Sequence, residues 1–284
     1  MSSSIFTPEQ FRSLVYARAS ECYRDLPWRR DPTPYTVLVS EFMLQQTQVP
    51  RVIPKYAAWL RLFPTIHALA TAPASAVLAA WSGLGYNRRA LALHSSARHI
   101  DAEFGGQIPA DEAALRSLPG IGVYTSRAIL AFAFNRPVVF LETNVRTVLL
   151  KYFYPDEDQV SDTRLIETAE YVLDRDAPSK WYTALMDYGA HIKKEEENHN
   201  RRSTSYRKQS PFNTSFRRVR GELLKLLVAE SPLDIEAVYG KLPFSHENIE
   251  QSAIELASEG FIVYDGVRLC LSEEPEGARV KDGS

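Results

Sequence analysis

The chemistry most visible in this sequence is anion binding by backbone N–H groups at the segment Leu118-Pro-Gly-Ile-Gly-Val-Tyr-Thr125. Pro119 and Gly120 end one helix, and Gly120 and Gly122 supply the backbone freedom of a short turn. A second helix starts near Val123, so its first N–H groups have no partner within the helix and point outward. A nucleic-acid phosphate is an obvious ligand for such a hairpin, and the alternative is an ordinary pair of packed helices.

A basic strip between Lys193 and Arg220 is a second feature that could bind phosphate. It holds nine Lys or Arg against three Glu, whereas the whole chain has a net charge of −2. An acidic body with one basic strip favours local binding of nucleic acid. The alternative is a solvated basic linker. The candidates for DNA contact in the strip are Arg201, Arg202, Arg207 and Lys208.

Helices must position these features. Asp111 is a candidate cap for the first hairpin helix, whose apolar residues recur at helical spacing. The second hairpin helix is predicted from Val123 to Asn135, where Pro137 ends it. Strand-like alternation is nearly absent before residue 260, so the first two-thirds of the chain is predicted to be all-α. Further helices are expected over 7–24, from Tyr35 onward, and over 53–63, 74–81 and 88–104.

A different pattern begins at Phe216. Helices are predicted over 216–229, 234–240 and 246–258, followed by a β-hairpin whose two-residue turn is Asp265-Gly266. Three helices and a hairpin, in this order, are typical of a winged helix. The third helix and its end hold four glutamates and no Lys or Arg, which disfavours insertion into a DNA groove and favours packing or docking. These glutamates are Glu247, Glu250, Glu255 and Glu259.

The domain organisation follows from these patterns. We predict an all-α domain over 1–192, a basic linker over 193–215, a winged-helix-like α+β domain over 216–272 and a disordered tail over 273–284. Hydrophobic residues make up 45% of the chain, and no apolar run reaches the roughly eighteen residues of a membrane span. The N-terminus lacks the pattern of a secretory signal, so a cytoplasmic location is expected. Cys22 and Cys270, the two cysteines, are interpreted as reduced structural thiols.

Three further segments accompany the hairpin: Ser40-Glu-Phe-Met-Leu-Gln-Gln-Thr-Gln-Val49, Trp81-Ser-Gly-Leu-Gly-Tyr86 and Leu141-Glu-Thr-Asn-Val145. Together with the hairpin, they resemble the helix-hairpin-helix DNA glycosylases, most closely the adenine glycosylases of the MutY type. The resemblance covers residues 25 to 192, almost without gaps. It implies the helical fold of that family and, as partner, double-stranded DNA that contains a mismatch or a damaged base. A monomer with no membrane partner is expected.

The resemblance implies roles for two carboxyl groups and a tyrosine. Glu41 matches the glutamate that protonates a purine leaving group and handles the water, and its apolar neighbours favour a partly desolvated site. Glu142 stands where the family has an aspartate that stabilises the developing oxocarbenium ion, and its extra methylene changes the reach of the carboxylate. Tyr124 stands where relatives resembling endonuclease III have a lysine that forms a Schiff base. A phenol cannot form one, so a monofunctional enzyme without lyase activity is expected.

Base flipping requires groups that fill the gap in the duplex. By resemblance, Gln46 matches the wedge glutamine and is expected on the helix of Glu41, and Tyr86 matches the aromatic residue that inserts beside the opposite base. Gly120 and Gly122 are assigned to the phosphate contact of the hairpin, where the family also suggests a monovalent cation. Asp187 lies in another segment shared with the family and is interpreted as structural.

Two departures from the family limit the prediction. The family usually has four cysteines after the position of Gly189 that ligate an iron–sulfur cluster, but this chain has no cysteine from Lys193 to Arg220, so no cofactor is expected. The winged-helix-like segment stands in place of the C-terminal domain with which MutY proteins recognise 8-oxoguanine. The favoured hypothesis is a monofunctional glycosylase that releases adenine. The alternatives are the same fold acting on a mismatched or damaged pyrimidine or another modified purine, and a catalytically weak lesion-binding protein.

Overall fold

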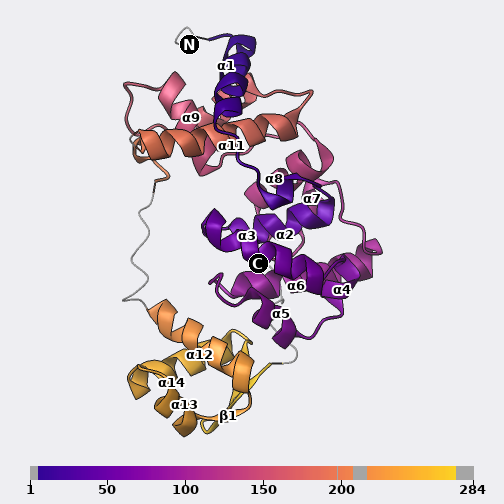
Figure 1. Ribbon diagram of the computed structural model, residues 1–284, viewed down its shortest axis with the longest axis vertical. Helices are drawn as coiled ribbons and strands as arrows, with labels where there is room; N and C mark the ends of the chain where they lie inside the picture. Colours follow the sequence, from indigo (N-terminus) through magenta and orange to yellow (C-terminus); the bar gives the residue numbers. More distant parts are fainter. Residues whose placement is uncertain (1–5, 197, 207–215, 273–284) are drawn as a thin grey trace, which may run out of the picture. The chain divides into compact units, whose positions relative to one another are not determined.

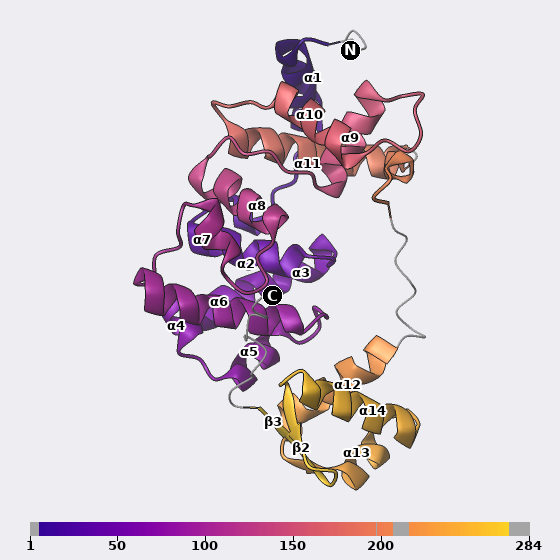
Figure 2. The same cartoon turned by 180° about the vertical axis from the view of Figure 1, so that it is seen from behind.

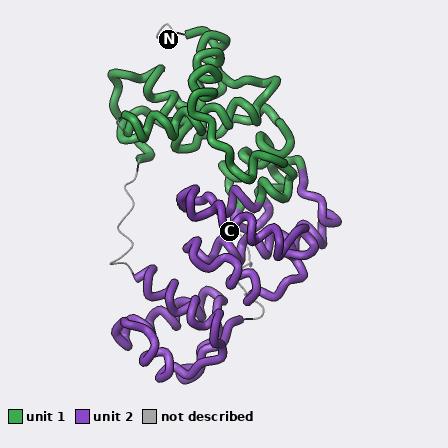
Figure 3. Tube along the Cα trace, viewed as in Figure 1, with its two compact units in different colours: residues 1–38, 110–116, 121–208 green, residues 39–109, 117–120, 209–284 purple. Residues whose placement is uncertain are grey.

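The structure is a computed structural model that describes residues 6–196, 198–206 and 216–272. The chain divides into two compact units whose segments interleave along the sequence (Figure 3). Unit 1 comprises residues 1–38, 110–116 and 121–208, and unit 2 comprises residues 39–109, 117–120 and 209–284. Of the predicted linker, residues 193–196 and 198–206 fall in unit 1, where they include the end of one helix and a further helical turn. The domain limits at 215 and 272 stay predictions.

Unit 1 is a group of helices around an apolar core. Helix α11 packs against α9, α8 and α1, and Figure 1 shows α1 crossing α11. In the core, the rings of Phe11 and Trp181 meet edge to face with centroids 6.1 Å apart. Its elements are α1 (Pro8–Glu21), the 3-10 helix η1 (Pro27–Arg29), α7 (Glu112–Arg116), α8 (Val123–Phe134), α9 (Thr143–Phe153), α10 (Asp162–Val172), α11 (Pro178–Glu195) and the 3-10 helix η2 (His199–Arg202).

Unit 2 contains the second half of α2 (Pro34–Leu44) and four more helices before residue 110. Helix α6 packs against α4 and α5, and the buried rings of Trp59 and Trp81 meet edge to face 5.6 Å apart. The helices predicted over 74–81 and 88–104 are confirmed with those bounds. The helix predicted from residue 53 begins earlier, and α4 was not predicted. These helices are α3 (Val49–Leu62), α4 (Ile66–Ala70), α5 (Ala74–Trp81) and α6 (Arg88–Phe104).

Besides residues 117–120, the rest of unit 2 that the structure describes is residues 216–272, which we call the C-terminal module. Figure 2 shows its strands β2 and β3 beside α12 and α14. The sheet has the order β1-β3-β2 with antiparallel pairs, and Asp265 fixes the hairpin turn by accepting hydrogen bonds from the backbone of Val267 and Arg268 at 2.9 and 2.8 Å. Its elements are α12 (Phe216–Glu230), β1 (Leu233–Asp234), α13 (Ile235–Lys241), α14 (His246–Ser258), β2 (Ile262–Tyr264) and β3 (Arg268–Leu271).

The predicted fold class is confirmed: the chain is all-α with a small α+β segment at its C-terminal end. Strand β1 was missed because its two residues form no alternating pattern and are defined by pairing with β3. The predicted tail over 273–284 lies outside the described residues. Among the helices that the structure describes, none has both the length and the apolar composition that a bilayer crossing needs.

Candidate active site and the contacts that support it

Glu41 lies inside α2 and is almost fully buried, with 7% of its surface exposed. It is the one charged residue of this helix. The preceding Ser40 and the following Phe42 and Met43 are buried as well. The desolvated setting predicted from the apolar neighbours is therefore present, and a buried carboxyl group of this kind is a candidate proton donor.

Glu142 lies in a different local setting, as the N-cap of α9. One carboxylate oxygen accepts a hydrogen bond from the backbone N–H of Asn144 at 2.6 Å, and the other accepts from the side-chain amide of the same residue at 3.1 Å. Burial raises the pKa of Glu142, while the Asn144 N–H and the charge of Lys193 act in the opposite direction. The cap places the carboxylate at the positive end of a helix, which opposes the rise in pKa that burial causes without cancelling it.

Lys193, near the end of α11, is a neighbour of Glu142 that the sequence analysis counted only as part of the basic strip. Burial lowers the pKa of Lys193, and the negative charge of Glu142 opposes this shift. A positive charge is thus held in the electrostatic environment of the candidate catalytic carboxylate. The sequence carries no signal for this pair, because the two residues belong to different helices of unit 1.

Gly189 allows α11 to approach Asn144, the residue that donates hydrogen bonds to the Glu142 carboxylate. A Cβ atom on Gly189 would lie 2.7 Å from the carbonyl carbon of Asn144 and 2.8 Å from its Cα, so no side chain fits there. Two residues earlier, Asp187 accepts hydrogen bonds from Arg24 at 2.6 Å and from Arg29 at 2.8 Å. Asp187 is 1% exposed, which fits the structural role predicted for it. The close approach at Gly189 thus packs α11 against Asn144, which in turn donates to Glu142.

The glycines of the hairpin have different roles in its geometry. Gly120 has a φ of +77°, and a Cβ there would lie 2.8 Å from the Cβ of Ala92, so both conformation and space require glycine. Gly122 is extended, is exposed and is the N-cap of α8. Glycine has no side chain that could cap the helix, so the N-terminus of α8 carries no side-chain cap. Phosphate and cation binding at this hairpin stay predictions.

Tyr124 belongs to the first turn of α8 and is half-buried. Its ring meets Phe140 edge to face at 5.6 Å, and Phe140 stacks on Tyr182 at 3.9 Å. Packing against Phe140 therefore accounts for an aromatic residue at position 124. The side chain there is a phenol, whereas relatives resembling endonuclease III have the amine of a lysine at this position.

Gln46 and Tyr86 both lie in turns with a left-handed backbone. The prediction that Gln46 lies on the helix of Glu41 was wrong, because α2 ends at Leu44 and Gln46 has a φ of +53°. Tyr86 has a φ of +49° and is 40% exposed. This conformation is uncommon for residues other than glycine, and it turns both side chains away from the helical path.

Arg89, which the sequence analysis did not single out, holds the two turns together. One guanidinium nitrogen donates to the carbonyls of Phe42 and Gln45, the first at 2.9 Å, and the other donates to Thr47 Oγ1 and the Gly85 carbonyl, each at 2.9 Å. Burial lowers the pKa of Arg89 to about 10, so the group stays charged at neutral pH. Its guanidinium also lies 5.4 Å from the ring centroid of Tyr86. Within unit 2, Gln46 and Tyr86 therefore share one anchor.

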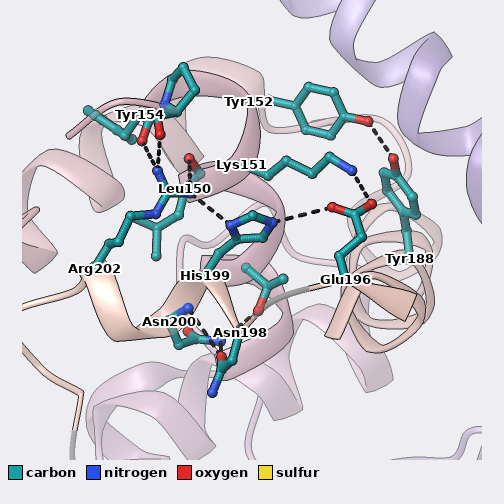
Figure 4. A network of polar contacts seen from close by, with 12 residues as sticks. Leu150, Lys151, Tyr152, Tyr154, Tyr188, Glu196, Asn198, His199, Asn200 and Arg202 are labelled. Carbon is teal, nitrogen blue, oxygen red and sulfur yellow. Dashed lines mark hydrogen bonds and ion pairs between the residues drawn. The ribbon is translucent and has the colours of Figure 1, made fainter. Parts of the chain in front are cut away.

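Arg202 of the basic strip is turned inward, as Figure 4 shows. Its guanidinium donates to His199 Nδ1 at 2.9 Å and to the backbone carbonyls of Leu150, Tyr154 and Pro155. Next to it, the Asn200 amide donates to Thr147 Oγ1 at 2.6 Å. The contacts of Arg202 and Asn200 attach η2 to α9 and to the residues that follow it, and we call this group of bonds the η2 clip. These hydrogen bonds account for the position of the Arg202 side chain without a contact to a DNA phosphate.

The other strip residues differ from Arg202. Arg201 is exposed, so its side chain can reach a phosphate. Arg207 and Lys208 lie outside the described residues. DNA contact by these residues stays a prediction. Within the described part of the chain, no group of three or more His, Cys, Asp or Glu side chains could hold a metal ion.

Comparison with known proteins adds the family. Residues 39–173 match the model of the HhH-GPD superfamily base excision DNA repair protein. The chain is similar to this superfamily over these residues. It is 43% identical over 171 residues to the adenine DNA glycosylase of Mycolicibacterium smegmatis, a match that covers 60% of the chain and 58% of the relative. It is 36% identical over 194 residues to the adenine DNA glycosylase of Homo sapiens, with 64% and 36% covered. The chain thus spans less than two thirds of the length of these relatives.

Solved structures show the same fold. A thermostable thymine-DNA glycosylase matches the chain with a TM-score of 0.59 and 25% identity, covering 68% of this chain and 90% of that one. A trapped endonuclease III–DNA covalent intermediate matches with a TM-score of 0.51 and 18% identity, covering 66% and 86%. The second likeness bears on the fold alone.

The predicted site residues are distributed over the two units. Unit 2 holds Glu41, Gln46, Tyr86 and Gly120, and unit 1 holds Gly122, Tyr124, Glu142 and Arg201. Within unit 2, Arg89 joins the Gln46 and Tyr86 turns. Within unit 1, Asn144, Gly189 and Lys193 support Glu142.

Proposed function

We propose that this protein is a monofunctional DNA glycosylase that releases adenine from duplex DNA by hydrolysis of the N-glycosidic bond. The observation that carries the proposal is the contrast between two carboxyl groups. Glu41 is buried in a helix without other charges, and Glu142 is fixed at the N-terminus of a second helix. Hydrolysis of a glycosidic bond uses two carboxyl groups in such different roles. Similarity to adenine DNA glycosylases supports adenine as the base.

The chemistry follows from these two settings. The target base must first leave the stack, because its glycosidic bond is not accessible within a duplex. Glu41 donates its proton to a ring nitrogen of adenine, so the base departs as a neutral molecule when the bond from C1′ breaks. Ionised Glu142 stabilises the positive charge that develops on the sugar. A water oxygen then bonds to C1′ and gives its proton to the Glu41 carboxylate, which restores the acid.

The proposed reaction ends at an abasic site, because Tyr124 offers no amine to attack the sugar. Borohydride trapping on an abasic duplex tests this point, and no covalent protein–DNA adduct is expected. An adduct would contradict a purely monofunctional enzyme. Its disappearance in a Lys193→Met variant would then assign the nucleophile to the lysine beside Glu142.

The experiment that tests the substrate is single-turnover base release from four duplexes that differ only in one pair, A·8-oxoG, A·G, T·G or U·G. Adenine release is expected, with a weaker preference for 8-oxoguanine over guanine opposite than a full MutY enzyme shows. The likeness to a thymine-DNA glycosylase favours a second candidate, excision of a mispaired pyrimidine. Release from T·G or U·G with adenine untouched would establish that candidate. Binding to all four duplexes without any release would favour a lesion-binding protein.

We also propose that the protein works as a monomer on DNA that holds a mismatch, without an iron–sulfur cluster. Ligation by four cysteines does not fit a chain whose two cysteines are Cys22, in unit 1, and Cys270, in the C-terminal module. The η2 clip supports the proposal, because hydrogen bonds attach η2, which follows α11, to α9. Protein purified without oxygen should be colourless, and stoichiometric iron would contradict the proposal.

A further inference from the structure

The first turn of α12 contacts the candidate aromatic wedge. The guanidinium of Arg217 donates a hydrogen bond to the Tyr86 hydroxyl at 2.8 Å and lies 5.9 Å from the centroid of its ring. Helix α12 also packs against α5, the helix that leads into the turn of Tyr86. All of these residues belong to unit 2.

A second contact of the module lies two residues beyond the tyrosine. The guanidinium of Arg88 pairs with the carboxylate of Glu259 through two bonds, at 2.8 and 2.9 Å. Arg220 of α12 donates to the same carboxylate and to Glu255. Although burial raises the pKa of Glu259, its hydrogen bonds from Arg220 and Arg88 keep this pKa below the ordinary value. The carboxylate is therefore ionised at neutral pH and holds two arginines at once.

These bonds explain the acidic character of α14. Glu255 and Glu259 are two of the four glutamates that disfavour DNA contact by the third helix of the module, and both are used within unit 2. Phosphates would compete with Glu259 for Arg88 rather than bind α14. The docking role expected from the sequence thus has a definite partner, the turn that carries Tyr86.

The ring of Tyr86 is held by arginines from two elements. Arg89 approaches it from α6 at 5.4 Å, and Arg217 approaches it from α12 at 5.9 Å. A guanidinium near an aromatic ring, together with a charge-assisted hydrogen bond to the hydroxyl, restricts the rotamers of the side chain. A ring restricted in advance loses less entropy when it enters a duplex.

We propose that the C-terminal module positions Tyr86 through Arg217 and thereby sets how strongly the protein distinguishes the base opposite the excised one. This inference rests on the proposed function, in which Tyr86 inserts beside that opposite base. In this role the module contributes to the reading of the second strand through Tyr86, without inserting a helix of its own into a groove. Arg217 is then a positioning residue.

The test compares two neighbouring arginines of α12. Arg217→Met removes the contact with Tyr86, and Arg218→Met removes an equal charge from a residue that lies 5.6 Å from the ring of Phe244. Discrimination is measured as the ratio of Kd values for duplexes with an abasic-site analogue opposite guanine and opposite 8-oxoguanine. Arg217→Met should lower this ratio roughly threefold to tenfold, the factor expected for one net hydrogen bond, and Arg218→Met should leave it unchanged.

Two further measurements make the test independent of catalysis and of global unfolding. Tyr86→Phe keeps the ring and removes the hydroxyl, so it should reproduce the effect of Arg217→Met, and the double variant should be no worse than either single one. Hydrogen exchange of the backbone amides of residues 83–88 should accelerate in Arg217→Met and not in Arg218→Met.

Equal Kd ratios and equal hydrogen exchange in the two arginine variants would overturn the inference. The effect of either substitution would then come from the loss of a positive charge and not from the contact with Tyr86. A higher Kd ratio in Arg217→Met would also overturn the inference, since the contact would then weaken the discrimination between the two opposite bases. Failure of the proposed function looks different. The wild-type protein would then release no adenine in the four-duplex experiment, whereas the exchange difference between the two variants would still report the docking.

Discussion

The two candidate catalytic carboxyls occupy opposite kinds of helical environment. Glu41 lies within α2 among buried apolar residues, and Glu142 lies ahead of α9, where it accepts hydrogen bonds from Asn144 and meets the charge of Lys193. The first setting has no second charged residue within the helix, whereas the second supplies hydrogen-bond donors and a cation that oppose the rise in pKa caused by burial. Local environment can therefore divide the two roles of glycosidic hydrolysis between two residues of the same type.

Exchange of the acid should have the largest effect. Glu41→Gln keeps the shape of the side chain and removes the transferable proton, so single-turnover release should fall by about 10²–10⁴-fold. Binding to the mismatched duplex should change little, because the variant alters no charge that faces phosphate. Glu103→Gln, at an exposed position of α6 in the same unit, is the matched control and should behave as wild type. A wild-type rate of base release in Glu41→Gln would show that Glu41 is not the proton donor.

Exchange of the stabilising carboxylate should have the second largest effect. Glu142→Gln removes the charge that faces the sugar and should slow release by about 10²–10³-fold. The same substitution should not lower the stability of the folded protein at neutral pH. A carboxyl whose pKa is raised by folding contributes stability below its unfolded pKa and loses it as pH rises through the folded pKa. At neutral pH the variant should therefore unfold at a temperature no lower than wild type, and this advantage should vanish on acidification. Thermal unfolding at several pH values measures it.

The charge of Lys193 provides a pH test of the same carboxylate. Because Lys193 lowers the pKa of Glu142, its replacement by Met should raise that pKa further. Release falls as Glu142 becomes protonated, so the acid limb of the rate profile should move to higher pH. Lys194→Met is the control, since Lys194 pairs with Glu195 at 2.9 Å instead. An unshifted acid limb in Lys193→Met would indicate that another group controls it.

These residues mark the limit of what the sequence predicts. The burial of Glu41, the hairpin turn at Gly120 and the order of elements in the C-terminal module were expected from local patterns, because caps, turns and apolar spacing act over a few residues. The role assigned to Glu41 came from the family resemblance instead. Arg89 and Lys193 were missed because their roles depend on partners from other helices. A local pattern was also misleading at Gln46, where a continuous polar run hides the left-handed turn after Leu44.

A substitution that touches neither carboxyl should have a smaller effect. Gly189→Ala would force Asn144 away from α11 and so displace the donor of the hydrogen bonds that hold the Glu142 carboxylate. A displacement approaching 1 Å can cost up to about a hundredfold in rate, so a tenfold to hundredfold slower release is expected. Gly221→Ala is the matched control, because a Cβ at this position of α12 meets no atom within 4 Å. The control should be neutral or more stable by about 0.4–1 kcal/mol. Equal rates of base release in the two variants would show that the contact between Gly189 and Asn144 does not contribute to catalysis.

The smallest expected effect concerns two adjacent arginines of the basic strip. Arg201 is exposed, whereas the guanidinium of Arg202 is bonded within the η2 clip. If Arg201 neutralises one phosphate, Arg201→Ala should reduce the slope of log K against log salt by about 0.9 and weaken binding to every duplex alike. Arg202→Met should leave that slope unchanged and lower the unfolding temperature, because three backbone carbonyls lose their donor. Equal loss of slope in both variants would mean that Arg202 leaves the clip to bind DNA, and the clip would then be a feature of the free protein alone.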